Sequence, residues 1–152
     1  MLDLARLLHV LGAVVWVGGM FFAYMALRPA AAALLEPPQR LSLWRETFRR
    51  FFFWVWLSVA GILASGLWMV ALYGGFGAVG WYVHVMLAIG LGMMLIFGHV
   101  YFSPYRRLAR LVQDENWKAA GEALGQIRRL VALNLMLGLL TIAVATAGRL
   151  TS

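Results

Sequence analysis

The sequence predicts an all-α protein, an integral membrane four-helix bundle. Of its 152 residues, 63% are hydrophobic and 12% are charged, which excludes a water-soluble globule of this size. Four windows of 19 to 23 residues carry no charge, and they cover residues 7–27, 51–73, 81–102 and 130–148. Each window can cross a hydrocarbon core about 30 Å thick as a helix. We therefore expect residues 1–152 to form one transmembrane domain with four spans.

Basic residues gather in two of the connections between these spans. Eleven of the thirteen lysines and arginines lie in the segments 28–50 and 103–129. The positive-inside rule makes that side cytoplasmic and both termini periplasmic, in a multi-pass protein of the bacterial inner (cytoplasmic) membrane. Topology and the anionic lipid bilayer then account for the net charge of +7, with no need for a nucleic acid partner.

The first two connections differ in character. Pro29 is expected to end the first helix, and a second helix is expected to restart at Pro37 and run into the second span. Glu46 and Arg50 are four residues apart, a spacing that stabilises a charged helical extension. The connection 74–80 is short, glycine-rich and uncharged. It predicts that spans two and three are antiparallel neighbours.

The third connection, 104–129, is amphipathic and is expected to begin as a helix lying on the cytoplasmic membrane surface. Asp114, Glu115 and Asn116 interrupt it and offer an N-cap for a further helix that runs from Trp117 into span four. Small residues recur within the spans and predict close helix packing. They are Gly12, Gly19, Gly61, Ser65, Gly90, Gly92 and Gly98.

Three histidines lie inside the predicted spans, where ionisable groups are expensive and indicate function. His9 and His84 begin two parallel spans, about 3 and 4.5 Å below the same surface. Two imidazoles at one depth on separate helices can hold a b-type haem iron from both faces. His99 lies about 22 Å further along its helix than His84 and cannot share that iron. Asn134 is at a depth where it could hydrogen-bond His99.

Residues around His9 suit a flat, anionic macrocycle. Gly12 leaves room on the same helical face, and Trp16 could stack against a ring edge. Arg6 and Arg149 are the basic residues of the outer side and could meet the propionates. The first hypothesis is therefore a haem b protein that transfers electrons near the periplasmic face, with a quinone or a periplasmic redox partner. Whether it is also a membrane oxidoreductase stays open.

Copper is the alternative ligand. Met69 lies at the depth of His9 and His84, and thioether with imidazole suits Cu(I). Met86 and Met93 are seven residues apart on span three and could extend a path. The absence of cysteine removes thiolate sites and covalent haem attachment. A copper-binding or copper-import protein is thus the second hypothesis, and an accessory subunit with merely interfacial histidines is the third.

A resemblance to a known family follows from residues His9, Trp16, Gly18 and Gly19. Their pattern, His-x6-Trp-x-Gly-Gly, resembles the first helix of the copper resistance protein D (CopD) family. The tract 128–149 is also similar to small single-domain members. The resemblance implies a four-helix membrane protein associated with haem or copper. The sequence leaves open whether it works as a monomer or a homodimer.

The related HemJ-type protoporphyrinogen oxidases share the His-x6-Trp-x2-Gly pattern. They also open their third helix with a cluster of tryptophan, histidine and lysine. Here Trp81 and His84 are present with altered spacing, and Met86 stands where the lysine is expected. HemJ-like protoporphyrinogen oxidase activity is therefore a further alternative that the resemblance implies.

Overall fold

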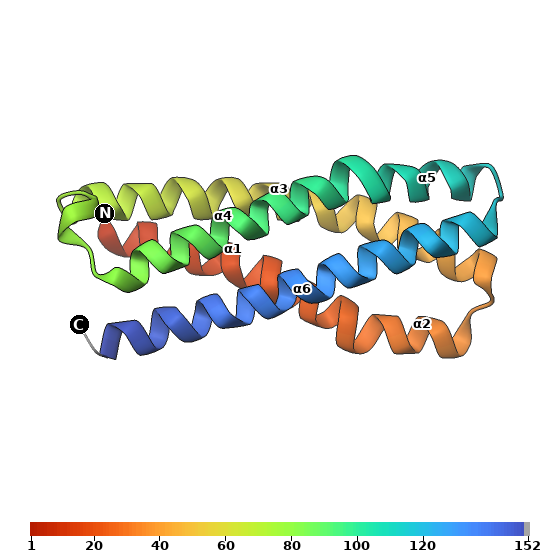
Figure 1. Cartoon of the computed structure of the whole chain (residues 1–152), viewed down its shortest axis with the longest axis horizontal. Coiled ribbons are helices and arrows are strands. Elements are labelled where there is room, and N and C mark those ends of the chain that lie inside the picture. The colour runs from red at the N-terminus through yellow and green to blue at the C-terminus, as the bar shows by residue number, and fades with distance from the viewer. Residues whose placement is uncertain (151–152) are drawn as a thin grey trace.

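Four long helical rods lie side by side in the computed structural model, which describes residues 1–150, with the side chains of 1–148 (Figure 1). The rods cover Leu2–Leu34, Pro37–Leu72, Trp81–Gln113 and Trp117–Gly148, and all four are long and apolar enough to cross a membrane. The described residues contain no strand. The predicted all-α membrane four-helix bundle is therefore confirmed.

The first rod is longer than predicted, because Pro29 does not end it. Helix α1 (Leu2–Phe22) passes through a π-helical turn, η1 (Ala23–Leu27), into α2 (Arg28–Leu34), and Pro29 lies in the first turn of α2. A proline lacks an amide donor and clashes with the carbonyl four residues before it. The wider π turn just before Pro29 relieves that clash, so the helix continues.

Helix α3 (Pro37–Leu72) forms the second rod without a break. It begins after an extended Glu36, with Pro37 at its first position, as the prolines predicted. The predicted charge pairing is also present, because Glu46 accepts hydrogen bonds from Arg49 at 2.6 Å and from Arg50 at 2.7 Å. The charged extension and the apolar span are thus one helix.

The third rod replaces the predicted surface helix over 104–129. Helix α4 (Trp81–Val100) continues through a π-helical turn, η3 (Tyr101–Tyr105), into α5 (Arg106–Gln113) in line with it (Figure 1). Leu108 and Val112 of α5 are buried, and α5 packs against α6 (Trp117–Leu150). Because other helices of the bundle cover the apolar face of α5, that face is not free to contact lipid at the membrane surface. The predicted N-cap is confirmed, since Asn116 Oδ1 accepts the amide of Ala119 at 3.2 Å.

The helices pair as α1 with α3 and α4 with α6, while α3 and α4 are not close partners. The expectation that spans two and three are neighbours holds where Phe52 and Trp56 of α3 meet the Phe97 ring of α4, at 5.4 and 5.0 Å between ring centroids, but a cavity separates the two helices nearer the termini. Their connection, which contains the short helix η2 (Phe76–Ala78), lies at the same end of the bundle as the two chain termini (Figure 1). A connection of this length lets the two helices diverge, and the space between them is filled only partly.

The other half of the bundle is densely packed with aromatic rings. Phe52 stacks on Phe48 at 5.1 Å between ring centroids and meets Phe97 and Tyr105 edge-on at 5.4 and 5.0 Å. Such pairs stabilise a core beyond the area that they bury. The bundle is thus closed at the end that carries most basic residues and opens toward the end with the termini.

Candidate functional site

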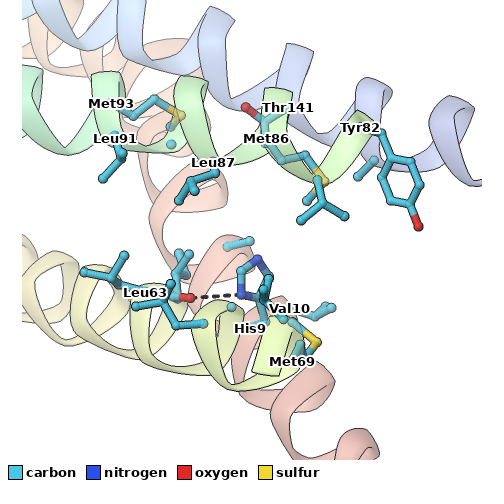
Figure 2. A pocket seen from close by; sticks show the side chains of 18 of the residues that line it. His9, Val10, Leu63, Met69, Tyr82, Met86, Leu87, Leu91, Met93 and Thr141 are labelled. Carbon is cyan, nitrogen blue, oxygen red and sulfur yellow. Dashed lines mark hydrogen bonds between the residues drawn. The ribbon is translucent and has the colours of Figure 1, made fainter. Parts of the chain in front are cut away.

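A cavity of about 420 Å³ lies between α1, α3, α4 and α6 (Figure 2). Its lining includes Arg6 near the N-terminus and Phe76 of the connection between α3 and α4, so it lies near the end of the bundle that holds the termini. We call it the outer cavity. Most of its wall is aliphatic, and the lining residues that the structure describes include no carboxylate. The polar, sulfur-bearing and indole side chains on the wall are Arg6, His9, Trp16, Met69, Tyr73, Tyr82, Met86, Met93, Met94 and Thr141.

His9 is held by two groups of α3. Its Nδ1 lies 3.0 Å from the carbonyl oxygen of Ile62 and 3.1 Å from the hydroxyl of Ser65. A carbonyl can only accept, so Nδ1 carries the proton and donates it. In the neutral ring, Nε2 is then unprotonated and carries an unshared lone pair. Figure 2 shows this second ring nitrogen turned toward α4. A histidine fixed through one nitrogen is the usual form of a metal ligand.

Ser65 contacts His9, although its spacing from Gly61 predicted a role in helix packing alone. Its hydroxyl donates to the Gly61 carbonyl at 2.5 Å, so its remaining capacity is to accept from His9. Gly66 leaves room for the His9 ring, because a side-chain carbon at residue 66 would lie 3.2 Å from His9 Cε1. The one hint in the sequence was a serine hydroxyl within an apolar span, because such a group needs a hydrogen-bond partner. Finding its partner required knowing which faces of α1 and α3 meet.

Methionines from two helices share this cavity with His9. Met69 comes from α3, and Met86 and Met93 come from α4 (Figure 2). The structure thus brings His9 and Met69 into one cavity and adds the methionines of span three. The described residues contain no group of three or more His, Cys, Asp or Glu side chains that could hold a metal ion. A metal held here would depend on thioethers beside one imidazole.

His84 lies apart from this site. It is exposed, its Nδ1 lies 3.3 Å from the Gly80 carbonyl, and its ring is 6.0 Å from that of Phe76. It is not among the residues that line the outer cavity. The structure therefore does not bring His9 and His84 together in the cavity, and the two-histidine haem site stays a prediction.

The expected hydrogen bond between His99 and Asn134 is absent. His99 is exposed, and Asn134 is buried with its Oδ1 lacking any hydrogen-bond partner. The two side chains were matched by depth alone, which ignores the direction in which each helix faces. Neither the third histidine nor this asparagine contributes to the outer cavity.

The other predicted site residues separate into different places. Arg6 lines the outer cavity and donates to the Tyr73 hydroxyl at 2.5 Å. Trp16 also lines this cavity and is buried. Gly12 does not line it, because an added side-chain carbon would meet α3 at 2.8 Å, so its role is close packing of α1 on α3. The side chain of Arg149 lies outside the described residues.

Fold and cavity together define a multi-pass membrane protein with imidazole and thioether donors in an apolar cavity. A family model, copper resistance protein D (CopD), matches residues 45–147. The match covers more than half of the chain, and the protein belongs to the CopD family. Neither the curated proteins nor the solved structures that were compared with it include a match. His9 and Trp16 lie outside the matched residues, so the family match and the first-helix motif are independent observations.

Proposed function

We propose that this protein binds Cu(I) in the outer cavity and passes it into the membrane domain. The observation that carries the proposal is the shared cavity wall of His9, Met69 and Met86. His9 offers a fixed imidazole with a free Nε2, and the methionines offer two thioethers from two other helices. Imidazole and thioether donors are the set that favours Cu(I) among the common biological metals.

Charge supports a monovalent soft ion over a hard divalent one. Calcium, magnesium and manganese take oxygen ligands, most often carboxylates, and the described lining has none. Cu(I) needs less compensation because it carries a single charge and binds neutral sulfur well. The cavity volume falls within the range of small-molecule sites, so size alone also admits an organic cofactor. The donor set is what favours copper.

We further propose that the outer cavity opens on the periplasmic side of a bacterial inner membrane. Eleven of the thirteen basic residues belong to the segments 28–50 and 103–129, at the end of the bundle opposite the termini. The positive-inside rule assigns that end to the cytoplasm. Copper would then enter from outside and meet His9 and Met69 first.

Anaerobic titration of detergent-purified protein with Cu(I), followed by X-ray absorption at the copper edge, tests this function. We expect one nitrogen and at least two sulfur neighbours. His9→Ala, Met69→Leu and Met86→Leu should each weaken binding by more than about 10-fold, because each removes a donor. Met136→Leu is the matched control, since Met136 is 68% exposed on α6 and faces away from the cavity.

The same purified protein distinguishes copper from haem. A visible spectrum with a Soret band and reduced α-band, lost in both His9→Ala and His84→Ala, would overturn the copper proposal in favour of the two-histidine haem protein. Only that result would reopen electron exchange with a quinone or periplasmic partner, and HemJ-like protoporphyrinogen oxidation. Copper binding without porphyrin bands supports the proposal.

A further inference from the structure

We propose that the outer cavity also binds one anionic phospholipid of the surrounding bilayer, with an acyl chain inside the cavity and the phosphate at Arg6. The proposal goes beyond copper binding and does not depend on it. A cavity needs only about 10–15 Å³ to hold one water, so a copper ion would fill a small part of the roughly 420 Å³ present. The rest of the wall is mostly aliphatic, and cavities of that kind take apolar ligands rather than water.

The outer cavity opens sideways between α3 and α4. Leu67 of α3 and Leu91 of α4 both line the cavity, yet each is 45% exposed. A side chain that lines a cavity and is also exposed stands at its opening. Figure 2 shows Leu91 on α4 across the space from Leu63 on α3. The two helices are not close partners, whereas α1 and α6 are in contact, so this side of the bundle is the less closed one.

This opening lies at the depth of the lipid acyl chains. Leu67 lies six residues before the end of the uncharged window 51–73, and Leu91 lies ten residues after the start of the window 81–102. At 1.5 Å per residue, these positions are about 9 and 15 Å below the membrane surface nearest the termini. One leaflet supplies half of a hydrocarbon core about 30 Å thick. A molecule that enters here therefore comes from the lipid, and the part that enters must be apolar.

Polar groups lie at the outer rim of the same cavity. Arg6 is the only lysine or arginine among the described lining residues, and it donates to the Tyr73 hydroxyl at 2.5 Å. A guanidinium has five N–H donors, so others remain for the oxygens of a phosphate. Asp3 lies 3.5 Å from Arg6, but its side chain is 96% exposed, and such surface pairs contribute little. Tyr82 of α4 adds a second phenol to the lining.

The combination of one cation and an apolar cavity is complementary to an anionic head on an acyl chain. A neutral quinone would fit the aliphatic wall but would leave the charge of Arg6 unused. A free fatty acid has suitable chemistry, yet phospholipid is what surrounds an opening within a leaflet. We therefore assign the site to an anionic phospholipid whose second acyl chain stays in the bilayer.

Native mass spectrometry of the delipidated, detergent-purified protein tests this site. Titration with phosphatidylglycerol should give one retained lipid per chain, at a concentration about 5-fold lower than phosphatidylcholine requires. That factor is the effect of about one basic residue beside an anionic headgroup. Arg6→Gln should remove the preference for phosphatidylglycerol and leave the binding of phosphatidylcholine unchanged.

Gly90→Phe and Gly92→Phe are the matched pair that tests where the acyl chain lies. Gly90 lines the outer cavity and Gly92 does not, and an added carbon has no neighbour within 4 Å at either position. Both changes are on α4, so their effects on folding should be similar. A ring at position 90 takes the space of the acyl chain, so Gly90→Phe should weaken phosphatidylglycerol binding at least 10-fold. Gly92→Phe should bind like the wild type.

Three results would overturn the proposal. Equal lipid retention by Gly90→Phe and Gly92→Phe would put the lipid outside the cavity. Equal affinity of the wild type for phosphatidylglycerol and phosphatidylcholine would remove the role of Arg6. Oleate that displaces phosphatidylglycerol one for one and binds more tightly would make a free fatty acid the occupant.

The lipid site and the copper site can fail separately. His9→Ala should retain the phospholipid, because the imidazole is not part of the proposed headgroup contact. A wild type that retains one phospholipid but binds no copper would overturn the proposed function and leave the lipid site in place. A wild type that binds copper but retains no phospholipid would overturn the lipid site alone.

Discussion

Gly66→Ala tests whether the position of the His9 ring against α3 controls the affinity for copper. The change adds one carbon, which would lie 3.2 Å from Cε1 and 3.5 Å from Nδ1 of the imidazole. Carbon atoms in favourable contact are about 3.5 to 4.0 Å apart, so the ring must retreat by about 0.3 Å or more. Its Nδ1 bonds to Ile62 and Ser65, at 3.0 and 3.1 Å, resist that movement.

The expected cost follows from this displacement. Forcing a side chain off its preferred rotamer costs about 0.5–1.5 kcal/mol, and disturbing groups that orient a metal ligand costs about 10–100-fold in affinity. We expect Gly66→Ala to weaken Cu(I) binding about 10-fold, which corresponds to about 1.4 kcal/mol. The donor atoms themselves remain present, so copper should still bind.

Gly61→Ala is the matched control on the same helix. It gains the same helix propensity, up to about 1 kcal/mol, but an added carbon there has no neighbour within 4 Å. Competition with a Cu(I) chelator of known affinity, under anaerobic conditions, measures both variants. If Gly66→Ala binds copper as tightly as Gly61→Ala, the placement of His9 against α3 is not what sets the affinity.

Three further predictions concern the bundle itself, each measured by thermal or denaturant unfolding in detergent. Gly138→Ala should destabilise by about 1–3 kcal/mol, because the added carbon meets a buried valine at 2.9 Å, whereas Gly125→Ala, with no neighbour within 4 Å, should not. Phe52→Ala should cost about 3–5 kcal/mol, and its 61% exposed neighbour Phe53 far less when changed to alanine. Asn116→Ala should cost about 1 kcal/mol through loss of the cap on α6, and an unchanged midpoint would contradict that role.

Glycine spacing shows where one-dimensional patterns stop being informative. Gly12 does allow α1 to approach α3 closely, as the repeat of small residues predicted. Gly61, Gly90, Gly92 and Gly98 follow equally suggestive spacings, yet an added carbon at any of them has no neighbour within 4 Å. A repeat of small residues shows that one face of a helix carries small side chains. It does not report whether another helix lies against that face.

The histidines show the same limit of a pattern read along the chain. Counting residues from the ends of the uncharged windows put His9 and His84 at one depth, and it also matched His99 with Asn134. Depth along a helix follows from its rise per residue and can be obtained from sequence. The direction of a side chain around the helix axis depends on which neighbours the helix packs against. His9 faces α3 and the outer cavity, and His84 lies outside that cavity.

The sequence by itself determined the four spans, an N-cap within residues 114–116 and the gathering of basic residues in two of the connections. These follow from local quantities: the length of an apolar run, the charge of a connection and the hydrogen-bonding habits of single residues. Only the tertiary structure decided that α3 diverges from α4, that Ser65 holds His9, and that Met69 and Met86 share its cavity. The reason is that the rotation of each helix is fixed by packing against the others, which no single segment encodes.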